Sequence, residues 1–179
     1  MISKENLVEK VHGIMSQLTG YTEKLVISFL KANNHKKVVR NLKKAEIKYR
    51  DFSEDDMNYV AKHLGALGKE FGIEVAICAE EYDLSPHGIG RNNCIDDDLI
   101  RREFSNDQIL MDFIGDGTGL KDSGQRKLCG CMVSKDIGEY HTCFHLCKYC
   151  YANVSEKAVK KNFERISQTG EMLLPELPN

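Results

Sequence analysis

The sequence predicts an α/β protein with a parallel sheet, followed by an irregular lobe rich in cysteine. Two short apolar runs typical of buried strands, residues 24–30 and 73–78, flank a helix-forming segment at 53–72. A strand, a helix and a second strand of these lengths form a βαβ unit, in which the two strands are parallel. Five of the seven cysteines then fall between Cys129 and Cys150.

The first elements follow from apolar spacing. Apolar residues recur at helical intervals over residues 3–18, and Gly20 ends that predicted helix. Residues 24–30 (KLVISFL) are apolar and partly β-branched, as in a buried strand. A short helix is predicted over residues 36–45. The basic run at 35–44 forms its solvated face, and the net charge of −2 gives no reason to expect a nucleic-acid partner.

The most completely specified element is the helix after Ser53. Ser53 and Asp56 have the spacing of a capping box. Phe52 and Met57 occupy the two positions of a hydrophobic staple, which fixes how the chain enters the helix. Gly72 lies where a left-handed residue ends a helix, directly before the second predicted strand.

The remaining elements are predicted from weaker signals. Residues 95–104 indicate a further helix, and the apolar residues 109–114 indicate a third strand. Glycine and polar residues dominate 115–140, which favours loop. Ser155 is expected to cap a last helix, and the tail from Met172 contains two prolines and is expected to be extended.

Length and composition suggest where the protein works. The chain of 179 residues divides into a partial α/β region (1–114) and a cysteine-rich lobe with a terminal helix (115–179). No stretch approaches the roughly 20 apolar residues of a membrane helix, and the charged N-terminus does not resemble a signal peptide. We therefore expect a cytoplasmic location. Thiols stay reduced there, so seven cysteines favour metal or redox chemistry over disulfides.

The strongest site signal is the spacing C-x3-C-x2-C formed by Cys143, Cys147 and Cys150. Three thiolates on one tight loop can each bind one iron of a 4Fe–4S cluster, which leaves the fourth iron open for a small-molecule ligand. Zinc remains an alternative, because His141 and His145 interleave with the thiols and mixed Cys/His sites suit zinc.

A second group consists of Cys78, Cys94, Cys129 and Cys131. Cys78 ends a predicted parallel strand, at the edge of the sheet where ligands bind in α/β proteins. If the four sulfurs lie within about 7 Å of one another, they could hold a second iron–sulfur cluster or a structural zinc. The alternative is a buried core thiol at Cys78 and unpaired cysteines elsewhere.

Three other patterns carry less information. Residues 115–119 (GDGTG) could cradle a phosphate but lack the helix that follows a dinucleotide-binding loop. The acidic run at 96–98 suits the first turn of a helix. Glu80 and Glu81 follow the second strand and could act as acid/base groups, although nothing in the sequence identifies their partners.

Longer motifs surround these cysteines in a characteristic order. They are residues 21–29 (YTEKLVISF), 78–80 (CAE), 88–89 (GI), 94–96 (CID), 121–126 (KDSGQR), 129–131 (CGC), 134–140 (SKDIGEY) and 142–153 (TCFHLCKYCYAN). With these motifs the chain resembles the C-terminal portion of a family called domain of unknown function eighteen-forty-eight. That family is similar to radical S-adenosylmethionine (radical-SAM) proteins in its C-terminal cysteine cluster.

The resemblance implies a partial TIM-barrel-like parallel sheet followed by an iron–sulfur lobe. It implies a cluster on the three-cysteine motif, with Tyr149 lining the cofactor edge and S-adenosylmethionine or another small ligand at the open iron. The expected function is that of an iron–sulfur protein, a redox or radical enzyme whose chain is truncated or split. A separately encoded N-terminal half or a second copy of the chain would then complete the sheet. The alternative from another functional class is a zinc-stapled, non-catalytic interaction module.

Overall fold

The computed structural model describes residues 2–117, 119–153, 155–166 and 174. The chain folds into two compact units, each described here by itself. The sheet unit comprises residues 2–30 and 52–134, and the cysteine-loop unit comprises 31–51 and 135–179. The predicted division of the chain after residue 114 stays a prediction. Most of the predicted extended tail lies outside the described residues.

The sheet has three parallel strands. These are β1 (Lys24–Ile27), β2 (Glu74–Cys78) and β3 (Gly90–Asn92), in the spatial order β1-β2-β3. Parallel pairing of β1 with β2 confirms the predicted βαβ unit, and Cys78 pairs in register with Asn92. The sheet is open, so the structure shows an α/β fold without a closed barrel.

The central helix α3 (Glu54–Phe71) begins and ends as predicted. Ser53 Oγ accepts a hydrogen bond from the Asp56 amide at 3.2 Å, and the Asp56 carboxylate accepts one from the Ser53 amide at 3.1 Å. Gly72 adopts the left-handed conformation, with φ 64°. Both ends are therefore defined by local sequence, and the helix returns the chain to a strand parallel to β1.

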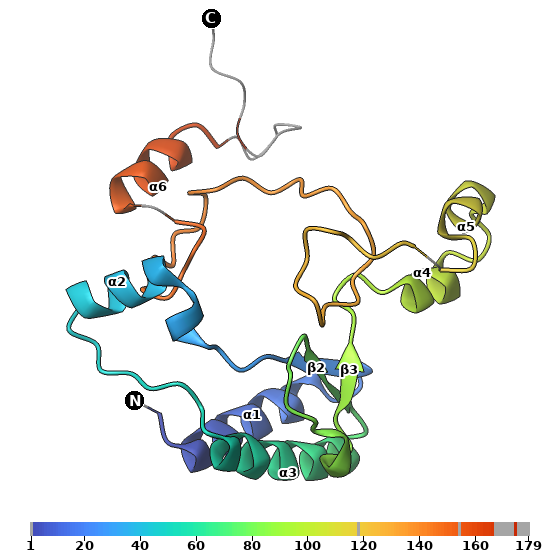
Figure 1. Cartoon of the computed structure of the whole chain (residues 1–179), viewed down its shortest axis with the longest axis horizontal. Coiled ribbons are helices and arrows are strands. Elements are labelled where there is room, and N and C mark those ends of the chain that lie inside the picture. The colour runs from blue at the N-terminus through green and yellow to red at the C-terminus, as the bar shows by residue number, and fades with distance from the viewer. Residues whose placement is uncertain (1, 118, 154, 167–173, 175–179) are drawn as a thin grey trace, which may run out of the picture. The chain divides into compact units, whose positions relative to one another are not determined.

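The core of the sheet unit lies between the sheet and two helices on one of its faces. α1 (Lys4–Leu18) packs against α3, and Figure 1 shows the two helices side by side. Met15 of α1 is fully buried. The other buried members are Phe29, Met57, Val60, Ala61, Leu64, Ile73, Val75, Ile77, Leu84 and Ile89.

Two glycines of α3 allow the chain to approach this helix closely. A Cβ atom at Gly65 would lie 2.0 Å from the carbonyl oxygen of His87, in the short helix η2 (Ser85–His87). A Cβ atom at Gly68 would lie 2.8 Å from the carbonyl oxygen of Ile73. The segments before and after β2 therefore pack on a face of α3 that has no side chain at these positions.

The predicted strand at 109–114 is wrong, because these residues form the helix α5 (Gln108–Ile114). Asp107 caps it by accepting a hydrogen bond from the Leu110 amide at 3.0 Å. Ile109 is 86% exposed, so the run is apolar in composition without being buried as a strand would be. The predicted helix before it is confirmed as α4 (Asp97–Glu103).

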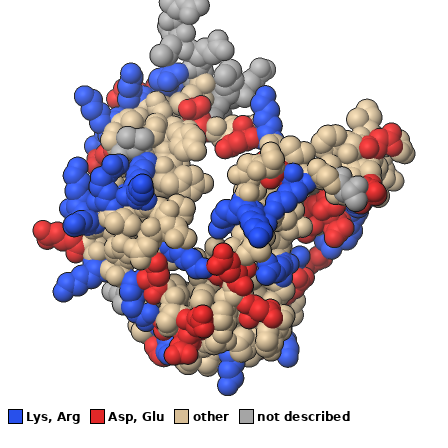
Figure 2. All heavy atoms as spheres, in the orientation of Figure 1, with Lys and Arg blue, Asp and Glu red and all other residues tan. Residues whose placement is uncertain are grey.

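The cysteine-loop unit is built on two short helices and a 3-10 turn. The turn is η1 (Ala32–Asn34), and the helices are α2 (Lys36–Lys44) and α6 (Glu156–Phe163). A small apolar cluster of Ala32, Val38, Leu42 and Tyr49 anchors the turn to α2. Lysine and arginine gather over α2, as Figure 2 shows, on the face opposite these buried residues.

Within the described part of the chain, no helix is both long enough and apolar enough to cross a bilayer.

Both helices predicted in the cysteine-loop unit are confirmed. α2 occupies the predicted segment, and Ser155 caps α6 by accepting a hydrogen bond from the Ala158 amide at 3.2 Å. The predicted loop after α5 is also mainly irregular among the described residues.

Candidate metal centres

The carboxyl edge of the sheet brings two cysteines together. Cys78 is the last residue of β2, and Cys94 follows the end of the neighbouring strand β3. Because the strands are parallel and adjacent, their carboxyl ends lie at the same edge. The Cys94 thiol donates a hydrogen bond to the Cys78 sulfur at 3.1 Å, so these two sulfurs are in direct contact.

A loop from later in the chain adds two more sulfurs to this edge. An antiparallel bridge between Lys121 and Met132 closes the loop that carries Cys129 and Cys131. The Cys131 sulfur accepts hydrogen bonds from the Cys94 amide at 3.1 Å and the Ile95 amide at 3.4 Å. Cys129 lies on the same loop, two residues before Cys131.

The backbone around this cysteine pair is fitted closely to the segment after β3. The Met132 amide donates to the Ile95 carbonyl at 3.1 Å, next to the amide–sulfur bonds of Cys131. Between the two cysteines, a Cβ atom at Gly130 would lie 2.1 Å from Asn93 Oδ1 and would displace that side chain. Because Gly130 has no side chain, the loop between Cys129 and Cys131 can pack closely against residues 93–95.

Burial and hydrogen bonding give the thiols unequal acidities. A hydrogen bond to Cys78, followed by burial, raises the pKa of Cys94 to about 12. For Cys131, burial opposes ionisation, but hydrogen bonds from the Ile95 amide, Cys129 and Cys94 outweigh it and lower the pKa. A backbone hydrogen bond lowers the pKa of Cys129, but burial and the Cys131 side chain together leave it raised.

The three-cysteine motif lies in the cysteine-loop unit. The Cys150 amide donates to the Cys147 carbonyl at 3.0 Å, which closes a turn between the second and third cysteines. Leu146, just before the turn, has a left-handed backbone with φ 51°. Cys143 is exposed, while Cys147 and Cys150 are half-buried. The three thiols thus lie on one accessible loop.

Side chains around the motif hold this loop in place. Asn153 Nδ2 donates to the Cys143 carbonyl at 2.8 Å, and Phe144 packs edge-on against Phe163 of α6 with ring centroids 4.2 Å apart. A hydrogen bond to Cys147, together with the negative charge of its thiolate form, raises the pKa of Tyr149. The predicted role of Tyr149 at the edge of a cofactor stays a prediction.

A cavity of about 300 Å³ adjoins the motif within the same unit. Asn153 is 9% exposed, and its Oδ1 atom is buried without a hydrogen-bond partner among the residues that the structure describes. The sequence offered no signal for this orphan acceptor, which depends on how the loop folds back on α2 and α6. The lining residues are Asn41, Lys44, Ala45, Leu146, Cys147, Lys148, Asn153, Ser155 and Glu156.

Across residues 2–117, 119–153, 155–166 and 174, no group of three or more His, Cys, Asp or Glu side chains already has the arrangement of a metal site. The structure brings the Cys78 and Cys94 sulfurs into contact, with Cys131 beside the Cys94 amide, and it places Cys143, Cys147 and Cys150 on one loop. Metal binding by either group stays a prediction. His145 is exposed on the cysteine loop. The predicted phosphate loop at 115–119 includes residue 118, which lies outside the described part.

Glu80 is engaged in shaping the turn after β2. Its side chain is 6% exposed, and its Oε1 atom accepts hydrogen bonds from the amides of Glu81 at 2.9 Å and Tyr82 at 3.4 Å. Ala79, just before it, has a left-handed backbone with φ 49°. These contacts give Glu80 a structural role in directing the chain away from Cys78.

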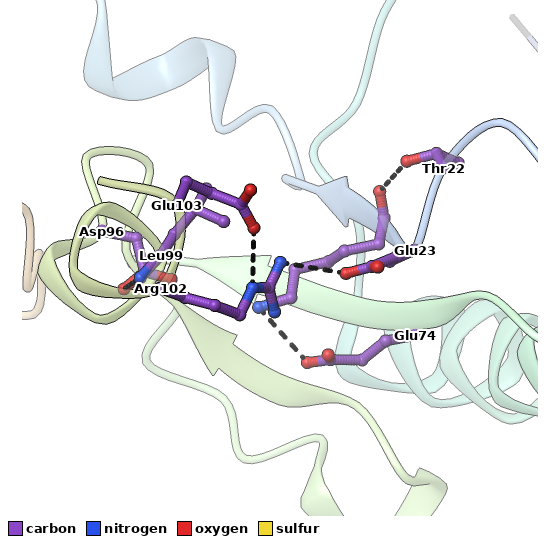
Figure 3. Close-up of polar contacts among 8 residues, drawn as sticks. Thr22, Glu23, Glu74, Asp96, Leu99, Arg102 and Glu103 are labelled. Atoms are coloured by element: carbon purple, nitrogen blue, oxygen red, sulfur yellow. Dashed lines mark hydrogen bonds and ion pairs between the residues drawn. The ribbon is translucent and has the colours of Figure 1, made fainter. Parts of the chain in front are cut away.

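A larger hollow in the sheet unit is bordered by exposed ion pairs. Figure 3 shows Arg102 of α4 beside Glu23 and Glu103, with nitrogen–oxygen distances of 3.0 Å and 2.8 Å. Lys24 lies 3.6 Å from Glu74, where β1 and β2 begin. Pairs this exposed contribute roughly 0–1 kcal/mol each, so they carry no site by themselves.

Comparison with known proteins gives one match. A model of the family described as domain of unknown function (DUF1848) matches residues 1–152, which include all seven cysteines. No curated protein and no solved structure matches the chain.

Proposed function

We propose that this chain, which belongs to the family described as domain of unknown function (DUF1848), is an iron–sulfur protein whose cluster is bound by Cys143, Cys147 and Cys150. The observation that carries the proposal is the C-x3-C-x2-C spacing on one accessible loop. No other cysteine occurs in residues 31–51 or 135–179, so a cubane bound there would have three cysteine ligands and one open iron.

The open iron would face a ligand site supplied by this chain. The adjoining cavity of about 300 Å³ is lined by Cys147 itself, by two lysines and by polar residues that include Asn41 and Ser155. Lys44 and Lys148 can attract an anionic group, and the Asn41 amide and the Ser155 hydroxyl can form hydrogen bonds with a polar group. A small molecule that carries both kinds of group fits this lining.

Radical-SAM-like chemistry is the finer form of the proposal. A reduced cluster supplies one electron, and the protein would orient the molecule that receives it. In this proposal the three-stranded sheet is part of a barrel-like sheet, completed by further strands. The support is the family's likeness to radical-SAM proteins in the cysteine motif.

The first prediction concerns the cluster itself. Protein prepared without oxygen should contain about four iron and four sulfide per chain at this site. Replacing Cys143, Cys147 and Cys150 by alanine should remove that iron and sulfide, as measured by metal and acid-labile sulfide analysis. His145→Ala is the matched control, because His145 is exposed on the same loop and should leave both values unchanged.

The control also separates the two metals. Zinc without sulfide in the wild-type chain, lost in both the cysteine variant and His145→Ala, would instead indicate the zinc-stapled module with histidine as a ligand.

The ligand of the open iron is tested with S-adenosylmethionine. Binding should change the electron paramagnetic resonance spectrum of the reduced cluster, whereas no change and no deoxyadenosine under strong reductant would contradict radical-SAM-like chemistry.

A further inference from the structure

We infer that Cys78, Cys94, Cys129 and Cys131 form a closed four-thiolate site for a single zinc ion, separate from the proposed iron–sulfur cluster. All four residues belong to the sheet unit, and the three cysteines of the proposed cluster belong to the other. Four thiolates arranged around one point suit either zinc or an iron–sulfur cluster. The distances between the sulfurs distinguish these possibilities.

A single ion requires its ligand sulfurs to be nearly in contact. Tetrahedral zinc with bonds of about 2.3 Å has sulfur–sulfur edges of about 3.8 Å. The Cys78 and Cys94 sulfurs are 3.1 Å apart, and the Cys131 sulfur lies 3.1 Å from the amide nitrogen of Cys94. Cys129 lies on the same loop, two residues before Cys131. The four cysteines therefore gather at one edge of the sheet, where a small rearrangement of the thiols would admit an ion.

An iron–sulfur cubane would require a different arrangement. Each of its four cysteines binds a different iron at a different corner, and inorganic sulfide lies between the irons. Ligand sulfurs around a cubane are therefore held apart by the body of the cluster. The 3.1 Å between the Cys78 and Cys94 sulfurs is close to the edge of about 3.8 Å in a tetrahedral zinc site, which favours one ion over four.

The protein also supplies the outer contacts that a thiolate site needs. Zinc with four thiolates carries two negative charges, and N–H groups directed at the sulfurs offset part of that charge. The amides of Cys94 and Ile95 both donate to the Cys131 sulfur, at 3.1 Å and 3.4 Å. Both amides lie in the segment that carries Cys94. The segment that would supply one zinc ligand therefore also supplies the hydrogen bonds to the Cys131 sulfur.

Burial indicates a structural rather than a catalytic site. Cys78, Cys129 and Cys131 are 8%, 5% and 5% exposed, whereas Cys94 is exposed and lines the larger hollow of the sheet unit. Three of the four proposed ligands are therefore buried. With four protein ligands there is no open position for water or substrate, which is the arrangement of structural zinc. The ion would fasten the loop closed by the Lys121–Met132 bridge to the carboxyl ends of β2 and β3.

The decisive experiment uses the wild-type chain and needs no variant to fold. Metal-free protein is alkylated under reducing conditions with and without Zn²⁺, and each cysteine is mapped by mass spectrometry. Zinc should protect the four cysteines of the sheet unit and leave Cys143, Cys147 and Cys150 open to alkylation. Protection of the second group instead, or of neither, would overturn the inference.

Metal content of two alanine variants makes the test quantitative. Wild type and Cys143→Ala should both hold about one zinc per chain, whereas Cys131→Ala should hold close to none. Sulfide should show the opposite pattern, falling in Cys143→Ala only. Sulfide lost from Cys131→Ala while zinc is unchanged, or iron without sulfide in place of zinc in the wild type, would overturn the zinc assignment. Failure of the proposed cluster would appear separately, as absence of sulfide with zinc still bound.

Discussion

The side-chain amide of Asn153 has one bonded group and one unbonded group. Its amide nitrogen holds the carbonyl of Cys143, while its amide oxygen is buried without a partner among the described residues. An unsatisfied buried acceptor costs about 1–3 kcal/mol. That cost falls on the residue whose amide nitrogen fixes the cysteine loop at its first cysteine.

We predict that Asn153→Ala loosens the cysteine loop. Loss of the bond to Cys143 costs about 1 kcal/mol of the free energy of unfolding, but removal of the unsatisfied Oδ1 atom offsets that cost, so the net stability should not fall. The effect should appear instead as faster loss of the proposed cluster during anaerobic gel filtration. Asn162→Ala is the matched control, since Asn162 makes a longer, exposed bond of 3.3 Å to the Tyr140 carbonyl. Equal effects of the two changes would contradict a special role for Asn153.

At this scale the sequence predicted that Cys78 and Cys94 could approach one another, and their sulfurs are in contact. The reason for the contact could not be read from the sequence, because the strand before Cys94, β3, has no apolar pattern. Asn153 could not be predicted. Whether an amide oxygen is satisfied depends on contacts between segments far apart in the chain, and a single sequence does not contain that information.

Among the elements, α3 relies on the absence of a side chain at one position. Gly65 lies within this 18-residue helix, where glycine normally lowers stability by about 1 kcal/mol relative to alanine. The carbonyl of His87 would lie 2.0 Å from a Cβ atom at this position. The helix therefore gives up some intrinsic stability so that η2 can pack directly against its backbone.

We predict opposite signs for two glycine-to-alanine changes. Gly65→Ala should destabilise the chain by about 1–3 kcal/mol, because a backbone carbonyl must move to accommodate the methyl group. Gly13→Ala should stabilise it by about 0.5–1 kcal/mol, because Gly13 lies in α1 and a Cβ atom there would meet no atom within 4 Å. Urea denaturation of both variants measures the two effects. A stabilising Gly65→Ala would show that η2 does not pack as described.

The elements that could be predicted from the sequence are those with local signals at both ends. α3 carried its capping box and terminal glycine, and β1 and β2 carried apolar runs of strand length. β3 could not be recognised, because its three residues, Gly-Arg-Asn, have no apolar pattern. The run at α5 was assigned wrongly, because a short apolar segment suits either state and Asp107 decided it.

At the scale of the whole molecule, the main feature is that the sheet is open and has an exposed edge strand. β1 is an edge strand, and Val26 within it is 42% exposed. An edge strand presents backbone groups that can pair with another chain. A separately encoded half or a second copy of the chain stays the predicted partner. Either one would bind by pairing a strand with β1. β2 is the central strand of the three, so β1 and β3 are the edge strands of the described sheet.

We predict that the isolated chain associates through β1 in a concentration-dependent way. Val26→Lys should shift the protein toward monomer in sedimentation experiments, because a charged side chain on an edge strand opposes pairing. Ile14→Lys is the matched control, since Ile14 is 48% exposed and belongs to α1 rather than to the sheet. A wild-type chain that stays monomeric at all concentrations, and gains no solubility from a co-expressed half, would contradict the prediction.

The cysteine-loop unit is assembled from two pieces of chain with most of the sheet unit between them. Lys37 Nζ donates to the carbonyl of Tyr151 at 2.7 Å, although these residues are 114 positions apart. A ribosome releases the first piece before residues 52–134 and the second piece after them, so the cysteine-loop unit can close only once the whole sheet unit has been synthesised. The proposed cluster would therefore be inserted into a chain whose sheet unit has already emerged.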